Sequence, residues 1–377
     1  MKTNDPWAAV TAATPEGYLF IDNVRFLSML AIVLRHCELS LFNGAPAPPL
    51  EAALIQLRTF GVPLFFVCSA FLMAAGLARP ASSLQGYWKS RLRQIATPWL
   101  LWVGVFEGLA LTKFCFRHGL DLHGIIEQSW RNVFDESYWF VPILLVSLAM
   151  LLPLYRYWPS WWLGLVFWVL SLFYGLNLYS HWVMSSHSVA IFGYLFPLWL
   201  GIQLFHHVQR LQAWLQRLPW GLILAIFCLS VTLMYLEERM LLRWGIPNTY
   251  NALQLSNQVY ALVVLMVCMK LRVRLMPAWI DVRKDSYGIY LSHPLVASFG
   301  RGVINLTAGL SGTEPSLFMR LPTLIHNPYT RMGLIFVWFI MIYAMSLLIT
   351  KALRMTPLAW TVGVTDLAQA SKMSHRC

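Results

Sequence analysis

Residues 21–42 read IDNVRFLSMLAIVLRHCELSLF, an apolar run of membrane length that carries Arg25, Arg35 and His36. An ionisable side chain at bilayer depth costs at least about 2.5–3.5 kcal/mol to insert, so such residues mark functional sites by default. Arg25 and His36 stand eleven positions apart, which separates them by about 16 Å along a helix and by only about 20° around its axis. The stretch therefore predicts a membrane helix with a cation and an imidazole on one face.

The rest of the chain has the composition of a polytopic membrane protein. Of its 377 residues, 58% are hydrophobic and only 12% are charged. A membrane helix needs about 20 apolar residues, and ten runs meet that need, at approximately 22–42, 53–78, 95–116, 138–155, 160–180, 188–206, 219–237, 255–271, 286–308 and 332–352. The predicted fold is all-α, with about ten transmembrane helices and both termini on one side of the bilayer.

The distribution of Lys and Arg predicts the orientation. These residues are more frequent in the segments on the side of the termini than in the opposite loops, so both termini are expected to be cytoplasmic. The net charge of +12 is spread between apolar spans and forms no basic stripe, so nucleic acid is not an expected partner. We expect a cytoplasmic tail over residues 1–17, a membrane domain over 18–352 and a second cytoplasmic tail over 353–377.

The cysteines and histidines do not indicate a metal site. The six Cys residues include no C-x-x-C pair and lie mostly inside apolar runs, which is typical of neither a zinc site nor a disulfide framework. Carboxylates at ligand spacing are also missing. The apolar spans, in contrast, make the lipid bilayer a predicted partner.

Two stretches near the N-terminus resemble the acyltransferase-3 family, integral membrane enzymes that O-acylate cell-surface glycans. The spacing of Arg25 and His36 is similar to the signature of the family's first helix. Residues 65–70, FFVCSA, resemble its FFxxSG motif, with Ala70 in place of Gly.

Two further stretches extend the likeness. Residues 89–93, KSRLR, are similar to the family's basic loop before helix three, although its Arg-x-x-Arg pair would need a base where Gln94 stands. Arg91 and Arg93 are therefore taken as the substitute pair. Residues 287–294, YGIYLSHP, resemble the family's aromatic-rich helix that ends in His.

One departure favours a branch of the family. Many members have a Glu shortly after the Trp of helix four, but Trp139 is followed by apolar residues and Pro over 141–145. This pattern resembles glucan succinyltransferases and exopolysaccharide acyltransferases. The likeness covers residues 18–352.

The resemblance implies an acyltransferase that transfers groups other than aminoacyl groups in a bacterial inner membrane. Its donor would be cytosolic acyl-CoA, such as acetyl-CoA or succinyl-CoA, and its acceptor a hydroxyl of a cell-surface or exported glycan or a lipid-linked saccharide. Acyl-CoA would be a substrate, and no permanently bound cofactor is expected. The sequence determines neither the acyl group, the glycan nor the oligomeric state.

His36 is the predicted general base, because imidazole titrates near neutral pH and acyl transfer needs a group that takes the hydroxyl proton. Arg25, on the same face, is assigned to the catalytic site with it. Two routes remain open, direct attack by the hydroxyl or transfer through an acyl-imidazole. The direct route is preferred because it asks only one thing of His36.

The donor-binding residues follow from the charge of coenzyme A. Arg25, Arg91 and Arg93 suit its phosphates, since a guanidinium binds phosphate through two hydrogen bonds; the alternative is that they only anchor the helices. Ser69 either bonds the pantetheine or thioester, or bonds back to its own helix. His293 either lines the donor channel or makes a structural bond between helices.

Two questions stay open at this stage. Glu107 lies inside an apolar run and is expected to pair with His36 or with an Arg across helices.

The alternative function is a secondary transporter or flippase for a lipid-linked sugar. A transporter requires neither a general base nor a cluster of arginines that binds the donor. A serine hydrolase is disfavoured because the chain contains no G-x-S-x-G.

Overall fold

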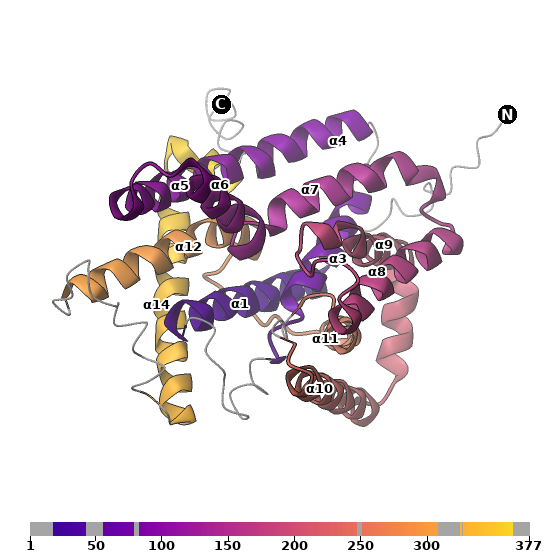
Figure 1. The fold of residues 1–377 in the computed structure, drawn as a ribbon. Coiled ribbons are helices and arrows are strands. Elements are labelled where there is room, and N and C mark those ends of the chain that lie inside the picture. Colours follow the sequence, from indigo (N-terminus) through magenta and orange to yellow (C-terminus); the bar gives the residue numbers. More distant parts are fainter. Residues whose placement is uncertain are drawn as a thin grey trace, which may run out of the picture. The chain divides into compact units, whose positions relative to one another are not determined.

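The computed structural model describes residues 18–42, 56–78, 83–246, 251–307, 325 and 327–364, without the side chains of 38–42, 117–118, 135–136 and 307. This part of the chain contains helices and no strand (Figure 1), so the all-α prediction is confirmed. The α-helices are α1 (Leu19–Phe42), α3 (Gly61–Leu77), α4 (Leu84–Arg91), α5 (Thr97–His118), α6 (Leu122–Trp130), α7 (Phe140–Leu151), α8 (Trp161–Ser180), α9 (Leu195–Arg217), α10 (Trp220–Arg243), α11 (Leu255–Lys270), α12 (Val282–Thr307) and α14 (Pro328–Arg354).

Short helices of other types connect several of these elements. Two have π geometry, η2 (Leu92–Ala96) and η3 (Arg131–Glu136), and three are 3-10 helices, η4 (Leu152–Tyr157), η5 (Val189–Tyr194) and η6 (Pro357–Val362).

Each predicted span corresponds to an α-helix, but the helices differ in how well they suit a bilayer. Among the described residues, six segments are long and apolar enough to cross a membrane, namely Leu84–Phe116, Phe140–Tyr157, Trp161–Ser180, Val189–Arg217, Trp220–Arg243 and Pro328–Arg354. Helices α3 and α11 are apolar but shorter, and α1 and α12 carry several charged residues. The chain is a multi-pass membrane protein, and the number ten remains a prediction, as does the orientation.

The surface of α5 supports a lipid environment. Leu101, Val105 and Leu109 of this helix, each about one turn after the last, are 40%, 45% and 61% exposed. Water-soluble proteins rarely expose apolar side chains in such a row, whereas lipid tails solvate them. The helix is therefore built to face hydrocarbon.

The chain divides into two compact units. The first comprises Met1–Ser28, Thr59–Leu92 and Phe140–Pro277, and the second comprises Met29–Arg58, Arg93–Trp139 and Ala278–Cys377. Helix α1 is continuous from Leu19 to Phe42, so it contributes Arg25 to the first unit and His36 to the second.

The core of the first unit centres on the close approach of α3 and α9. A Cβ atom added to Gly201 of α9 would lie 2.2 Å from the carbonyl oxygen of Val67 and 3.0 Å from the Cβ of Ala70. The Phe66 ring stacks on Tyr194, with 4.6 Å between centroids. The FFVCSA motif is thus a packing surface of α3 in which the small residues let the two backbones approach.

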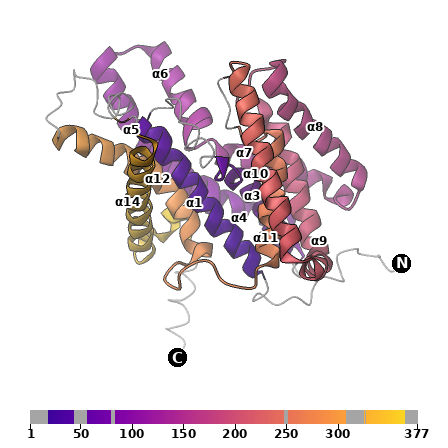
Figure 2. The same ribbon diagram turned by 90° about the horizontal axis from the view of Figure 1, so that it is seen from below.

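Two charged side chains hold the ends of helices in the first unit. Glu237 of α10 accepts a hydrogen bond from the Ser256 amide at 2.7 Å, at the N-terminus of α11, which lies beside α10 (Figure 2). Lys270, at the end of α11, donates to the carbonyls of Leu215 at 2.8 Å and Leu218 at 2.7 Å. Both contacts match the helix dipole, because carboxylates favour N-termini and cations favour C-termini.

In the second unit α12 crosses α14 (Figure 1). The contact is tight at Gly288, where a Cβ would lie 2.4 Å from Thr350, and Asp285 forms a salt bridge with Arg354. The short helix η6 packs onto the same unit, since Trp102 donates to the Thr361 carbonyl at 2.9 Å. The segment predicted as a C-terminal tail, 353–377, thus begins with packed residues.

The predicted N-terminal tail, 1–17, lies outside the described residues. So do residues 365–377.

Candidate active site

The second unit brings two of the predicted site residues together. His36 of α1 and His293 of α12 face each other with 5.0 Å between ring centroids and 48° between ring planes. His36 is half-buried and His293 is 0% exposed. Helix α1 therefore presents its predicted base to a second imidazole that comes from a distant part of the sequence.

The hydrogen bonds of His293 assign its protonation. Its Nδ1 atom lies 2.7 Å from the Tyr290 carbonyl oxygen and 3.2 Å from that of Ile289. A carbonyl only accepts, so Nδ1 carries the hydrogen and Nε2 carries the lone pair of the neutral ring. Nε2 is buried and has no hydrogen-bond partner among the described residues. It is a free acceptor beside His36.

Helix α12 is held in place by tyrosine hydroxyls that donate to backbone carbonyls. These bonds are Tyr287 to Ile95 at 2.6 Å, Tyr290 to Ser137 at 3.1 Å and, in the opposite direction, Tyr138 to Leu291 at 3.0 Å. Because they hold α12 at Tyr287, Tyr290 and Leu291, in the two turns before His293, the second imidazole has a fixed position.

Arg58 adds a cation that the sequence did not single out. It is 6% exposed, its Nη1 atom donates to the Leu34 carbonyl at 3.1 Å, and it acts electrostatically on His36 and Cys37. No motif in the sequence gave it a role. The signal was its place inside the predicted span 53–78, where a charged residue is expensive to bury.

The first unit contains three of the predicted donor-binding residues. Arg25 is half-buried and acts electrostatically on Cys68, the neighbour of Ser69 on α3. Ser69 is itself half-buried. Arg91 ends α4, with its guanidinium carbon 4.9 Å from the centroid of the Tyr87 ring. Arg25 and the FFVCSA motif thus meet in one unit.

The remaining predicted residues are placed as follows. Arg93 is exposed in η2 and belongs to the second unit. Glu107 of α5 acts electrostatically on Tyr138, and its pairing with His36 stays a prediction. Among the described residues, no group of three His, Cys, Asp or Glu side chains is arranged to hold a metal ion.

Comparison with known families decides the identity of the chain. A family model described as an acyltransferase domain, that of the acyltransferase-3 family, matches residues 18–355. The chain belongs to the acyltransferase-3 family. No curated protein and no solved structure matches it. The resemblance found in its motifs is confirmed, and the protein is a membrane acyltransferase.

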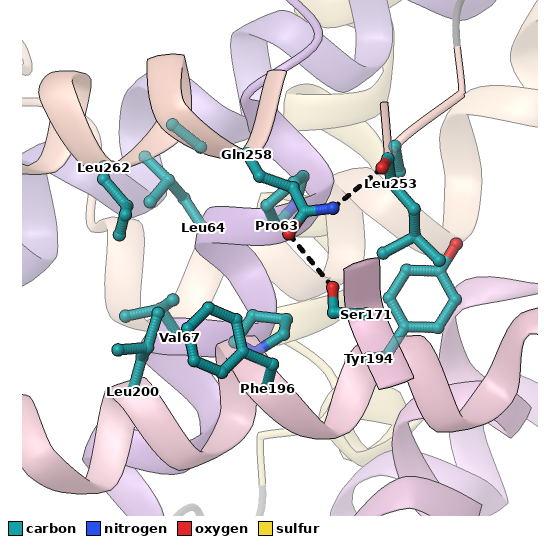
Figure 3. A pocket seen from close by; sticks show the side chains of 13 residues that line it. Pro63, Leu64, Val67, Ser171, Tyr194, Phe196, Leu200, Leu253, Gln258 and Leu262 are labelled. Atoms are coloured by element: carbon teal, nitrogen blue, oxygen red, sulfur yellow. Dashed lines mark hydrogen bonds between the residues drawn. The ribbon is translucent and has the colours of Figure 1, made fainter. Parts of the chain in front are cut away.

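The first unit of this acyltransferase also contains a small apolar pocket that is partly open (Figure 3). Its lining comes from α3, α8, α9, α11 and the segments next to them, and includes Leu64, Val67 and Leu262. The Gln258 amide, which contacts the pocket, already donates to the Leu253 carbonyl at 2.8 Å and accepts from Ser171 at 3.0 Å. These polar groups of the lining are therefore already paired with each other or with the backbone.

Proposed function

We propose that this acyltransferase moves an acetyl, succinyl or similar group from cytosolic acyl-CoA to a hydroxyl of a cell-surface or exported glycan, or of a lipid-linked saccharide, in a bacterial inner membrane. The observation that carries the proposal is the pairing of half-buried His36 with buried His293. Within a family of acyltransferases, this pairing offers a base of suitable chemistry. No single observation in the described residues favours the alternative hypothesis of a secondary transporter or flippase.

The reaction begins when His36 takes the proton of the acceptor hydroxyl. The oxygen attacks the thioester carbon, a C–O bond forms, the C–S bond breaks, and the coenzyme A sulfur leaves with the bonding electrons. His36 then returns the proton to that sulfur. A general base of this kind contributes about 10²–10⁴-fold in rate.

Arg58 has a separate role in this mechanism. Negative charge develops on the thioester oxygen during attack, and a fixed cation in a site of low dielectric stabilises it. Arg58 is buried, is tied to the α1 backbone and acts on His36. We therefore assign the oxyanion to Arg58.

The donor is held by the residues predicted for it. Arg25, Arg91 and Arg93 bind the phosphates of coenzyme A, and Ser69 bonds the pantetheine arm. Within the first unit, the electrostatic effect of Arg25 on Cys68, next to Ser69, supports a common role for Arg25 and Ser69 in holding the donor. His293, which was predicted to line the donor channel, is assigned instead to the chemical step because it contacts His36.

The test compares glycans by mass spectrometry. A deletion strain is expected to lose one acyl mass from a surface glycan, and the size of that mass identifies the group. The wild-type gene and a His207→Gln variant, which changes an exposed histidine of α9, are expected to restore it. His36→Gln is not, because an amide keeps a hydrogen bond but cannot take a proton. Restoration at the parental rate by His36→Gln would overturn the proposal.

The route of transfer is tested separately on purified protein. Incubation with labelled acyl-CoA but no acceptor is expected to leave the protein unlabelled, since direct transfer forms no acyl-enzyme. A labelled acyl group on His36 would establish the acyl-imidazole route.

A further inference from the structure

Pro294 interrupts the backbone hydrogen bonding of α12 immediately after His293. Proline has no N–H, so the carbonyl four residues earlier, that of Tyr290, receives no donor from the helix backbone. A buried carbonyl without a donor costs free energy. Here His293 Nδ1 takes the place of the missing amide, at 2.7 Å from the Tyr290 oxygen.

This substitution determines the tautomer of His293. The two neutral tautomers of an imidazole differ only in which nitrogen carries the hydrogen, and the partner of one nitrogen decides between them. With the Tyr290 carbonyl on Nδ1, the lone pair must be on Nε2, the buried atom that has no hydrogen-bond partner in the described part of the chain. An ordinary residue at 294 would supply its own N–H to that carbonyl and compete with His293.

We propose that Pro294 locks His293 in the Nδ1–H tautomer, so that His293 Nε2 accepts a hydrogen bond from His36 and orients it as the base. The ring centroids are 5.0 Å apart. An N–H···N bond of about 3 Å, with about 1 Å from each nitrogen to its ring centre, spans about 5 Å. His293 Nε2 has no hydrogen-bond partner in the described part of the chain, so the bond forms when half-buried His36 turns about its Cβ–Cγ bond.

This makes His293 a positioning residue and rests on the role proposed for His36. In a catalytic triad a carboxylate fixes the tautomer of the base; here a neutral imidazole does so. The His36 nitrogen that faces His293 keeps its hydrogen, and the other nitrogen is left free for the hydroxyl proton. That proton later passes to the coenzyme A sulfur, so His293 gains no net proton.

The tautomer can be measured without any acyl transfer. Protein labelled with ¹⁵N-histidine is purified in detergent, and the ring nitrogens are observed by NMR, with His293→Gln used to assign the His293 signals. The wild type is expected to show a protonated Nδ1 and an unprotonated Nε2. In Pro294→Ala the Nε2–H tautomer is expected to appear. Ser292→Ala is the matched control, because it removes hydroxyl bonds to the Gly288 and Ile289 carbonyls in the same turn, at 2.9 and 3.5 Å, and adds no donor for the Tyr290 carbonyl.

Kinetics give the second readout. Pro294→Ala is expected to lower kcat about tenfold with an unchanged KM for acyl-CoA, whereas Ser292→Ala keeps both values. A wild-type His293 protonated on Nε2, or a Pro294→Ala variant with the parental tautomer and kcat, would overturn the inference and leave His36 as the base. If His36→Gln is active while His293 is in the Nδ1–H tautomer, the proposed function is wrong, but the effect of Pro294 on the His293 tautomer is still supported. Should Pro294→Ala not fold, Pro294→Ser restores the same amide and serves in its place.

Discussion

Arg58 is the residue in which stability and chemistry are most closely joined. A buried guanidinium needs partners to offset its desolvation, and Arg58 binds the Leu34 carbonyl at 3.1 Å, two positions before His36. The bond that offsets its burial therefore also fixes it beside the predicted base. Removing its charge is expected to affect the chemical step more than the binding of donor.

We predict that Arg58→Gln lowers kcat about 10²–10³-fold, the usual effect of losing one group that stabilises an oxyanion, and leaves the KM for acyl-CoA nearly unchanged. Arg58→Lys is expected to recover part of the rate because it keeps the charge. Steady-state kinetics on purified protein measure both.

The control for Arg58 is Arg331→Gln, which changes another buried arginine of the second unit, on α14. It is expected to keep kcat. Equal losses of kcat in both variants would reduce Arg58 to a structural residue.

The three donor arginines give a different kinetic pattern. Each charge-assisted hydrogen bond contributes about 1.5–3 kcal/mol, so Arg25→Ala, Arg91→Ala and Arg93→Ala are each expected to raise the KM for acyl-CoA about tenfold to a hundredfold, with little change in the KM for acceptor. Arg156→Ala, an exposed basic position of η4, is the matched control. An unchanged KM for acyl-CoA in all three variants would show that these arginines only anchor the helices in the membrane.

The site residues show what sequence reasoning can and cannot reach. Helical periodicity predicts that Arg25 and His36 share a helix, because both belong to one local element. The contact of His36 with His293 depends on how α1 and α12 pack within the second unit, which no local pattern encodes. Arg58 escaped attention because its Leu34 partner is a backbone carbonyl, and the identity of a residue does not reveal a backbone acceptor.

At the scale of elements, small residues set the distance between α3 and α9. The atom nearest to an added Cβ at Gly201 is the Val67 carbonyl oxygen, at 2.2 Å. Since this oxygen belongs to the backbone of a helix, it cannot turn aside as a flexible side chain can. The FFVCSA motif thus has a structural use in addition to the contact proposed for Ser69.

We predict that Gly201→Ala destabilises the protein by about 1–3 kcal/mol, the typical cost of overpacking a core. Gly221→Ala is the matched control in the same unit, since an added Cβ on that glycine of α10 meets nothing within 4 Å. Thermal unfolding in detergent compares the two. A Gly201→Ala variant that melts with the wild type would show that α9 can shift without cost.

The elements themselves were largely predictable. Apolar length located an α-helix at every predicted span, because a bilayer leaves no other way to satisfy the backbone. Helix η6 was missed because it follows the last span and was assigned to a tail, although its run Pro-Leu-Ala-Trp is apolar. Its packing depends on a bond from Trp102 to the Thr361 carbonyl, between segments far apart in the sequence.

At the scale of the whole molecule, the charge asymmetry predicts which loops face the cytoplasm. The segment around η4 is expected inside and the segment around α6 outside. Both contain exposed positions, Arg156 and His123, at which a cysteine can be introduced into a cysteine-free background.

We predict that an impermeant maleimide labels His123→Cys in intact spheroplasts and labels Arg156→Cys only after the membrane is opened, because the first position faces outward and the second faces the cytoplasm. Labelling of both positions in opened membranes is the internal control for reactivity. The opposite pattern would place the donor arginines on the side without coenzyme A and would contradict the proposed direction of transfer.

The tyrosines that secure α12 have a consequence for evolution. Tyr287 and Tyr290 bind the carbonyls of Ile95 and Ser137, and every amino acid supplies such a carbonyl. Positions 95 and 137 are therefore free to drift among homologues without loosening the helix that carries His293. A change of either tyrosine to phenylalanine, in contrast, removes the hydroxyl that makes the hydrogen bond. We therefore expect the family to keep the tyrosines at positions 287 and 290 and to vary the residues at positions 95 and 137.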